Sequence, residues 1–315
     1  MARDRAVSQT ERGIVSFKSI PDSPCWPMSV RQRAAPDRNR RPVNVSLPNG
    51  MIVSCLQKHE VPLIGLEIES YFSNGIEVRP GDTIFDVGAN IGLFSLAAYE
   101  RCAQNLRVFA FEPVGAIFEL LCANVKRNTS MGQIEALGFG LSSTSETVPF
   151  AYYPGAPVLS TAYPDEEADI RTIKETILNS IMYLDEAPLA LRWLSWAPEF
   201  LRSAILDYAL ERTLRGQAIR CRMQTLSRFV RQREIEHIDL LKVDVEKAEL
   251  DVLRGIENND WCKIRQAVIE VHDFEDRLNT VTALLCRHGL AEITVEQPLT
   301  NMNSNIFTVF ATRPQ

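Results

Sequence analysis

The chain has 315 residues, of which 45% are hydrophobic and 23% are charged, as in an ordinary globular protein. Its formal net charge of −6 argues against a nucleic-acid-binding protein, and it has no apolar run of the length that a membrane span needs. Seven scattered cysteines without CxxC spacing indicate a reduced protein with no structural zinc site. Because the first residues lack the apolar core of a signal peptide, we expect a cytoplasmic protein.

The first 81 residues are expected to precede the main fold. Residues 1–40 are predicted to form a disordered basic tail, and a basic arm for an acidic partner is the alternative. Over residues 43–56, two alternating runs flank the turn sequence Pro48-Asn49-Gly50, which predicts a hairpin. A short helix is expected over 60–72. Residues 41–81 therefore form a hairpin and a helix ahead of the core.

From residue 82 the pattern changes to strands that alternate with helices. Short apolar runs that predict strands occur at 83–88, 107–113, 133–143, 238–245 and 266–273. This alternation predicts an α/β fold with a mostly parallel sheet and right-handed crossovers. The runs at 291–297 and 305–313 are expected to close the sheet as an antiparallel pair. The predicted core thus comprises residues 82–150 and 219–315.

Residues 151–218 interrupt this alternation with a long helical pattern. Leu194, Leu201, Ile205 and Tyr208 fall on one face of a helix. Two interpretations remain open: the segment is an insertion that packs its apolar stripe on the core, or it is a lid over a lipophilic substrate. A membrane-surface helix is a weaker third alternative, because acids and bases are mixed on it.

The sharpest motif is "DTIFDVGANIGLF", in which a strand runs into Asp86 and is followed by Gly88, Asn90 and Gly92. Glycines in such a turn let the backbone approach a ligand closely. The next strand ends at Glu112, where a carboxylate can accept both hydroxyls of a ribose. The spacing is not the GxGxxG of dinucleotide-binding loops, and an acid before the turn suits an amino-bearing ligand. The motif predicts a nucleoside-type cofactor.

These segments resemble the class I S-adenosylmethionine-dependent methyltransferases. "DVGANIGLFSL", "FEP", "LLKVDVEKAELDVLRG" and "VIEVHD" are similar to the FkbM-type family, over roughly residues 60–150 and 219–312. The resemblance implies a Rossmann-like seven-stranded sheet whose last strand is antiparallel, and S-adenosyl-L-methionine as cofactor. It also implies cofactor-binding roles by position for Asp86, Gly88, Asn90, Gly92, Glu112, Leu141 and Ser142. Asp86 would lie near the amino end of the ligand, and Leu141 and Ser142 near adenine.

The stretch "LLKVDVEKAELDVLRG" places four carboxylates after a predicted strand. Asp244 and Glu246 are candidate catalytic residues, because ligands in open parallel sheets bind beyond the carboxyl ends of the strands. Glu249 is an intermediate case, and Asp251 is expected on the solvent face of a helix. The family usually has glycine where this chain has Lys247. Since lysine rarely adopts a positive φ, the turn is predicted to be in the ordinary αR or β region.

The strand "VIEVHD" brings Glu270 and His272 to one side of the sheet. His272 is the third candidate catalytic residue, as a general base, and a structural hydrogen-bonded histidine is the alternative. The acids and the histidine have no recognisable ligand spacing, so no metal is predicted.

We therefore expect a cytoplasmic S-adenosylmethionine-dependent methyltransferase. The resemblance implies O-methylation of a natural-product acceptor, and Trp193 and Trp196 in the insertion suggest a bulky, lipophilic molecule that could be carrier-bound. N-methylation of an amine or indole is the nearest alternative. A nicotinamide-dependent oxidoreductase on a Rossmann sheet and a catalytically silent binding module are alternatives from other classes. The sequence leaves the oligomeric state open.

Overall fold

The computed structural model describes residues 41–130, 132–164, 213–297 and 305–314, together with five single positions between 201 and 210. The predicted basic tail, Trp193, Trp196 and most of the predicted insertion over 151–218 lie outside the described residues. No helix of the described part of the chain is long and apolar enough to cross a membrane.

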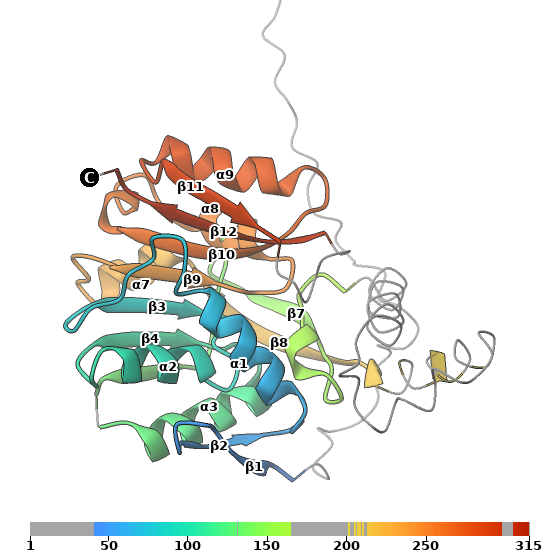
Figure 1. Cartoon of the computed structure of the whole chain (residues 1–315). Coiled ribbons are helices and arrows are strands. Elements are labelled where there is room, and N and C mark those ends of the chain that lie inside the picture. The colour runs from blue at the N-terminus through green and yellow to red at the C-terminus, as the bar shows by residue number, and fades with distance from the viewer. Residues whose placement is uncertain are drawn as a thin grey trace, which may run out of the picture.

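A seven-stranded sheet forms the centre of the fold (Figure 1). Its order is β11-β12-β10-β9-β3-β4-β5, and β12 runs antiparallel to both of its neighbours while the other pairs are parallel. The bounds are β3 Thr83–Val87, β4 Arg107–Phe111, β5 Ile134–Leu137, β9 Leu240–Val243, β10 Gln266–His272, β11 Glu292–Glu296 and β12 Ile306–Thr312. The predicted mostly parallel sheet with an antiparallel last strand is confirmed.

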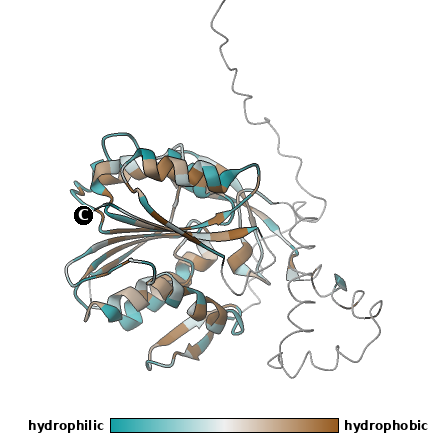
Figure 2. Ribbon diagram, turned by 45° about the horizontal axis from the view of Figure 1, so that its top comes forward, coloured by the Kyte–Doolittle hydropathy of each residue, from teal (hydrophilic) through white to brown (hydrophobic). Residues whose placement is uncertain are grey.

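Helices cover both faces of this sheet (Figure 2). Side chains alternate along each strand, so Ile84 points to one apolar core and Phe85 to the other. The first core packs helices α1 Glu60–Ser70, α2 Leu93–Arg101 and α3 Gly115–Asn128 against the sheet. The second core packs helices α7 Leu226–Gln232, α8 Glu249–Arg254 and α9 Arg277–Arg287. The 3-10 helix η4 Trp261–Lys263 precedes β10.

The hairpin predicted over 43–56 is present. Strands β1 Val43–Ser46 and β2 Ile52–Cys55 pair antiparallel, and Gly50 in the turn has a φ of +86°. The side chain of Asn124 on α3 binds the backbone of Ser54 at both its N–H and its carbonyl, at 2.7 and 3.0 Å. The hairpin is therefore fastened to the main fold.

The strand predicted over 133–143 is wrong in its extent. It ends at Leu137, where the chain turns sharply because Phe139 N–H donates to the Leu137 carbonyl, and β6 Gly140–Leu141 pairs with β8 instead. Strands β7 Thr147–Tyr152 and β8 Gln217–Gln224 complete this small sheet, and the 3-10 helix η2 Pro157–Leu159 follows β7. Because Tyr152 pairs with Gln217, the segment that connects β7 and β8 begins and ends at neighbouring points.

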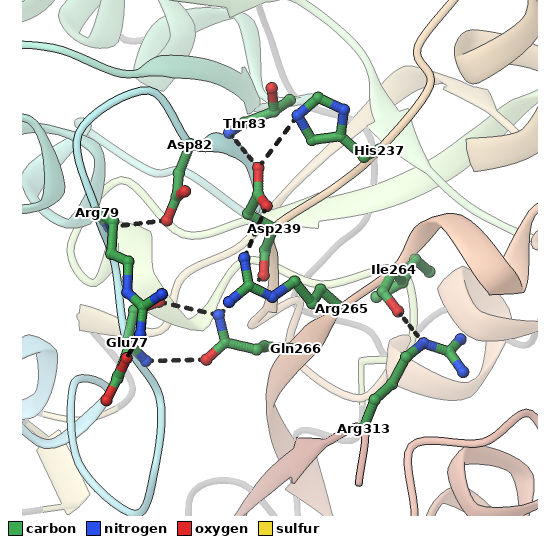
Figure 3. Close-up of polar contacts among 10 residues, drawn as sticks. All are labelled: Glu77, Arg79, Asp82, Thr83, His237, Asp239, Ile264, Arg265, Gln266 and Arg313. Atoms are coloured by element: carbon green, nitrogen blue, oxygen red, sulfur yellow. Dashed lines mark hydrogen bonds and ion pairs between the residues drawn. The ribbon is translucent and has the colours of Figure 1, made fainter. Parts of the chain in front are cut away.

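Buried polar groups are well paired at the amino ends of the central strands (Figure 3). The Asp239 carboxylate accepts a hydrogen bond from Thr83 N–H at 2.8 Å and lies 3.3 Å from Arg265. The Gln266 side chain binds the backbone of Glu77 at both its N–H and its carbonyl, each at 2.9 Å. These contacts fix the strands at the end opposite to the cleft described next.

Candidate active site

A large open cleft lies at the carboxyl ends of β3, β4, β9 and β10. It holds about 1030 Å³ of empty space, counted to its open mouth. Helix α1, the loop after β3, the small sheet and η2 complete its walls. This is where ligands of open parallel sheets bind, at the point where the strand order reverses between β3 and β9.

The turn after β3 brings backbone to the floor of the cleft. Gly88 has a φ of +76°, and a Cβ added to it would lie 1.7 Å from the Asp244 carbonyl oxygen. Only glycine fits, because both the backbone angle and the space exclude a side chain. Asn90 follows with a φ of +48° and also lines the cleft. Gly92, with a φ of +90°, packs against Leu121 and does not line it.

Glu112, at the end of β4, lies in the wall of the cleft and is only 5% exposed. Its two oxygens accept hydrogen bonds from Asn90 N–H at 3.1 Å and Val114 N–H at 2.8 Å. Burial raises the pKa of the Glu112 carboxyl to about 7, although these hydrogen bonds oppose the shift. Leu141 lines the same part of the cleft, whereas Ser142 does not. Of the predicted cofactor residues, Gly88, Asn90, Glu112 and Leu141 thus share one wall.

Asp86 is fully buried and does not line the cleft. Its carboxylate accepts a hydrogen bond from Ser95 at 2.6 Å and lies 3.2 Å from the Lys242 ammonium. Lys242 faces the cleft, where it also lies 3.4 Å from Asp244 and donates to the Gly88 carbonyl at 3.0 Å. Burial lowers the pKa of Lys242, but the two aspartates outweigh burial and raise it. Lys242 thus stands between Asp86 and the cleft.

A second wall of the cleft, which meets the first where Gly88 packs against the Asp244 carbonyl, is crowded with acids. Asp244, Glu246, Glu67 and Glu270 all line it. Burial, followed by repulsion from Asp244, raises the pKa of Glu270 well above its usual value. Burial also raises the pKa of Glu67, which lies against Glu270. The Tyr71 hydroxyl approaches Asp244 at 3.5 Å. This end of the cleft therefore favours positively charged or proton-donating groups.

The prediction of an ordinary turn at Lys247 is wrong. Glu246 and Lys247 both have positive φ, +48° and +75°. Lys247 N–H donates to Glu249 at 2.8 Å, and the Lys247 carbonyl accepts a hydrogen bond from Arg277. The Glu246 carbonyl accepts a hydrogen bond from Thr161 at 2.5 Å. These contacts hold a left-handed turn that lysine alone does not favour.

His272 does not line the cleft directly but lies behind Glu246. Its Nε2 is 3.2 Å from Glu246, and its Nδ1 is 2.8 Å from Glu249. Burial lowers the pKa of His272, but hydrogen bonds to both glutamates outweigh burial and raise it to about 10. Glu249 is fully buried and also binds Arg277 at 2.9 Å. Asp251, expected at the surface, is half-buried and accepts a hydrogen bond from Tyr163.

Sequence reasoning missed Lys242, Glu67 and Tyr71 as residues of the site. A charged residue inside the apolar run "LLKV" was the signal for Lys242, because a lysine buried in a strand needs a counter-ion. Glu67 and Tyr71 belong to the helix before the core, and no local pattern in that helix indicates that it lies across the strand ends.

Comparison with known proteins points to one family. A family model described as Methyltransferase FkbM domain matches residues 86–291. The chain is 34% identical over 256 residues to 31-O-demethyl-FK506 methyltransferase FkbM of Streptomyces tacrolimicus, a match that covers 80% of this chain and 90% of that protein.

Two other relatives are also similar in sequence. The chain is 34% identical over 288 residues to AMB antimetabolite synthetase AmbE of Pseudomonas aeruginosa, covering 86% of this chain but only 12% of that much longer protein. It is 33% identical over 211 residues to Methyltransferase sdnD of Sordaria araneosa, covering 64% of this chain and 71% of that protein. The crystal structure of Methyltransferase FkbM from Methylobacillus flagellatus is a distant likeness, with 14% identity, a TM-score of 0.46 and coverage of 76% and 45%. Because the family model matches residues 86–291 and the FkbM relative is similar over most of both proteins, the chain belongs to the FkbM methyltransferase family.

Proposed function

We propose that the protein uses S-adenosyl-L-methionine to methylate a hydroxyl of a lipophilic natural product. The observation that carries the proposal is the division of one cleft into two unlike walls. One wall has the glycine turn and Glu112, and the other has Asp244, Glu246 and Glu270. A nucleoside cofactor suits the first wall, and a proton-donating acceptor suits the second.

The residues of the first wall fit the cofactor. Gly88 has no side chain at the point where a ligand must approach the backbone. Glu112 has the position and the hydrogen-bond-accepting oxygens that ribose hydroxyls need. Leu141 offers an apolar contact for adenine. Because Lys242 stands between Asp86 and the cleft, Asp86 would act on the ligand's amino end only through Lys242 or by setting its position.

The second wall fits the acceptor. When bound, S-adenosylmethionine would supply the methyl group from a positively charged sulfur, with neutral S-adenosylhomocysteine as the product. Asp244 is the residue best placed to receive the hydroxyl proton, because it lines the cleft at the end of β9 and is partly exposed. His272 holds Glu246 and Glu249 and is therefore a positioning residue rather than the general base.

The acceptor class is supported by apolar side chains and by the relatives. Apolar residues around the mouth and walls of the cleft include Ile64, Phe94, Phe150, Pro157, Val158 and Met223. Two relatives are named for natural products, an FK506 precursor and an antimetabolite. A lipophilic secondary metabolite, free or carrier-bound, fits both.

The acids favour one second candidate, N-methylation. A wall with four carboxylates attracts an amine or the cation that forms on it during transfer. Mass spectrometry of products from matched alcohol and amine acceptors separates the two reactions by the methylated atom.

The cofactor is tested by thermal shift of the full chain with S-adenosylhomocysteine and with NAD. S-adenosylhomocysteine should raise the melting temperature and NAD should not, because the turn lacks the dinucleotide spacing. Stabilisation by NAD alone would replace the proposal with an oxidoreductase, and stabilisation by neither would favour a catalytically silent module.

The division of the cleft is tested by two substitutions. Asp244→Asn should lower kcat by roughly 10²–10⁴-fold with little change in cofactor affinity, because it removes a proton acceptor. Glu112→Ala should instead raise the cofactor KM with a smaller effect on kcat at saturation. The opposite pattern for the two variants would show that the walls are wrongly assigned.

A further inference from the structure

We propose that Glu246, Glu270 and His272 form a site for one divalent transition-metal cation at the acceptor end of the cleft. Glu270 and His272 lie on β10, two residues apart and on one side of the strand, and Glu246 lies in the turn after β9. One ligand atom from each of these three side chains lies within 4.8 Å of the other two.

This spacing is close to that of a bound ion. Neighbouring ligand atoms at about 2.0–2.2 Å from one metal lie about 3–3.6 Å apart. His272 Nε2 and Glu246 already have such a separation, at 3.2 Å, and the Glu270 carboxylate needs to move inward by about 1–2 Å at most. A set of one imidazole nitrogen and two carboxylate oxygens suits Mn²⁺ or Zn²⁺ better than Mg²⁺, which prefers oxygen ligands alone.

Glu270 supplies an independent reason to place a ligand here. Its side chain is only 6% exposed, yet it lines the cleft, and although the carboxyl meets Glu67, its buried Oε2 accepts no hydrogen bond from the described residues. An unpaired buried carboxylate oxygen is costly, so such an atom in a cleft indicates a missing partner. Its neighbour Glu67 is also an acid, and a cation would relieve both carboxyls, whereas Asp244 already has Lys242 at 3.4 Å.

His272 is already oriented as a metal ligand. Its Nδ1 faces Glu249 at 2.8 Å, and Glu249 is itself fixed by Arg277 at 2.9 Å. A buried carboxylate on one ring nitrogen that directs the other toward the metal is the usual support of metal-bound histidines. Nε2 thus points to Glu246, 3.2 Å away, and a cation between them would take the place of the Nε2 proton.

The position of the site suggests its use. A cation beside Asp244 could bind the acceptor oxygen and make its proton more acidic, while Asp244 receives that proton. This use rests on the proposed function, whereas cation binding itself does not.

The test measures Mn²⁺ alone. The full chain is freed of metal with EDTA, desalted and titrated with Mn²⁺, and free Mn²⁺ is followed by its electron paramagnetic resonance signal. We expect saturable binding of one ion per chain. Glu270→Gln and His272→Gln should each weaken binding at least about tenfold. Glu296→Gln, an exposed acid on β11, is the matched control and should leave binding unchanged.

Wild-type protein that binds no Mn²⁺ saturably, or variants that bind it as the wild type does, would overturn the site. Glu246→Gln gives a third variant on a partly exposed turn, in case either β10 variant fails to fold. A cooperative urea-unfolding transition serves as the folding control for each variant, and thermal shift by S-adenosylhomocysteine is measured separately. If Mn²⁺ binds at these residues but S-adenosylhomocysteine does not stabilise the chain, the proposed function fails and the cation site stands. If S-adenosylhomocysteine stabilises the chain but Mn²⁺ does not bind at these residues, the cation site is wrong and the proposed function stands.

Discussion

Strand β9 has an aspartate at each end, and the two side chains have opposite surroundings. Asp239 precedes the strand, and its carboxylate is paired with the Thr83 N–H and with Arg265 (Figure 3). Asp244 follows the strand and shares one cation, Lys242, with Asp86 among further acids. At the amino ends, polar groups are paired to hold strands together. At the carboxyl ends, acids are left partly uncompensated, which costs stability but leaves charge available to a ligand.

The largest difference in stability between the two ends should appear when a basic side chain is removed from each. Lys242→Met leaves Asp86 buried without its counter-ion and should cost about 3–5 kcal/mol of unfolding free energy. Arg265→Met at the amino end removes a half-exposed partner of Asp239 and should cost about 1 kcal/mol or less. Urea unfolding measures both.

The cause of that loss can be checked with a second substitution. Adding Asp86→Asn to Lys242→Met should recover part of the stability, because no uncompensated charge is then buried. Equal costs for Lys242→Met and Arg265→Met would contradict the contrast between the two ends.

Glycines at the two ends of β3 offer the next comparison. Gly88→Ala, after the strand, meets both a φ of +76° and the Asp244 carbonyl. Left-handed strain and overpacking together should cost about 2–5 kcal/mol. Gly81→Ala, before the strand, has a φ of +96° but open space around it, so strain alone should cost about 1–2 kcal/mol. Similar unfolding midpoints for the two variants would mean that the loop after β3 can move away from Asp244.

A smaller effect is expected in the pH dependence of S-adenosylhomocysteine binding at the wall that contains Glu112. Because burial raises the pKa of Glu112 to about 7, its carboxyl is mostly protonated at pH 6 and mostly ionised at pH 8. If ribose hydroxyls donate to the ionised form, affinity for S-adenosylhomocysteine should rise about tenfold from pH 6 to pH 8. Calorimetric titration of wild type and Glu112→Gln provides the check, since the variant should lose this dependence. A wild-type affinity that is flat with pH would remove Glu112 from the ribose site.

The sequence was enough to predict the order of elements and one wall of the cleft. Periodicity located the strands and the hairpin, and the "DVGAN" turn with Glu112 identified residues that do meet. Both signals are local, so they can be read along the chain.

The other wall depends on pairing between distant segments. Lys242 meets Asp86 because β9 and β3 pair in a register that places them side by side, and Glu67 meets Glu270 because α1 lies beside the strand ends. The prediction of an ordinary turn at Lys247 failed for a related reason. Contacts with Arg277 and Glu249 override the backbone preference of lysine, and neither contact is visible from propensity.

The smallest expected effect concerns backbone strain at the two ends of β9. Lys247 follows the strand with a φ of +75°, and Glu234 precedes it with a φ of +51°. Left-handed residues other than glycine cost about 1–2 kcal/mol, and glycine loses about 0.5–1 kcal/mol more than they do on folding. Lys247→Gly and Glu234→Gly should therefore each stabilise the chain by about 0.5–1 kcal/mol in urea unfolding.

Activity should separate these two variants. Lys247 lies in the turn that carries Glu246 into the acceptor wall, whereas Glu234 lies in a loop that leads to the amino end of β9. If the Lys247 side chain contributes to the acceptor pocket, Lys247→Gly should be more stable than the wild type and its acceptor KM should change by several-fold. Glu234→Gly should be more stable with an unchanged KM. Lys247→Ala, which keeps the strain and loses the side chain, should change the KM without the gain. An unchanged KM in both Lys247 variants would mean that the turn needs only its left-handed backbone, which lysine tolerates because Arg277 and Glu249 hold it.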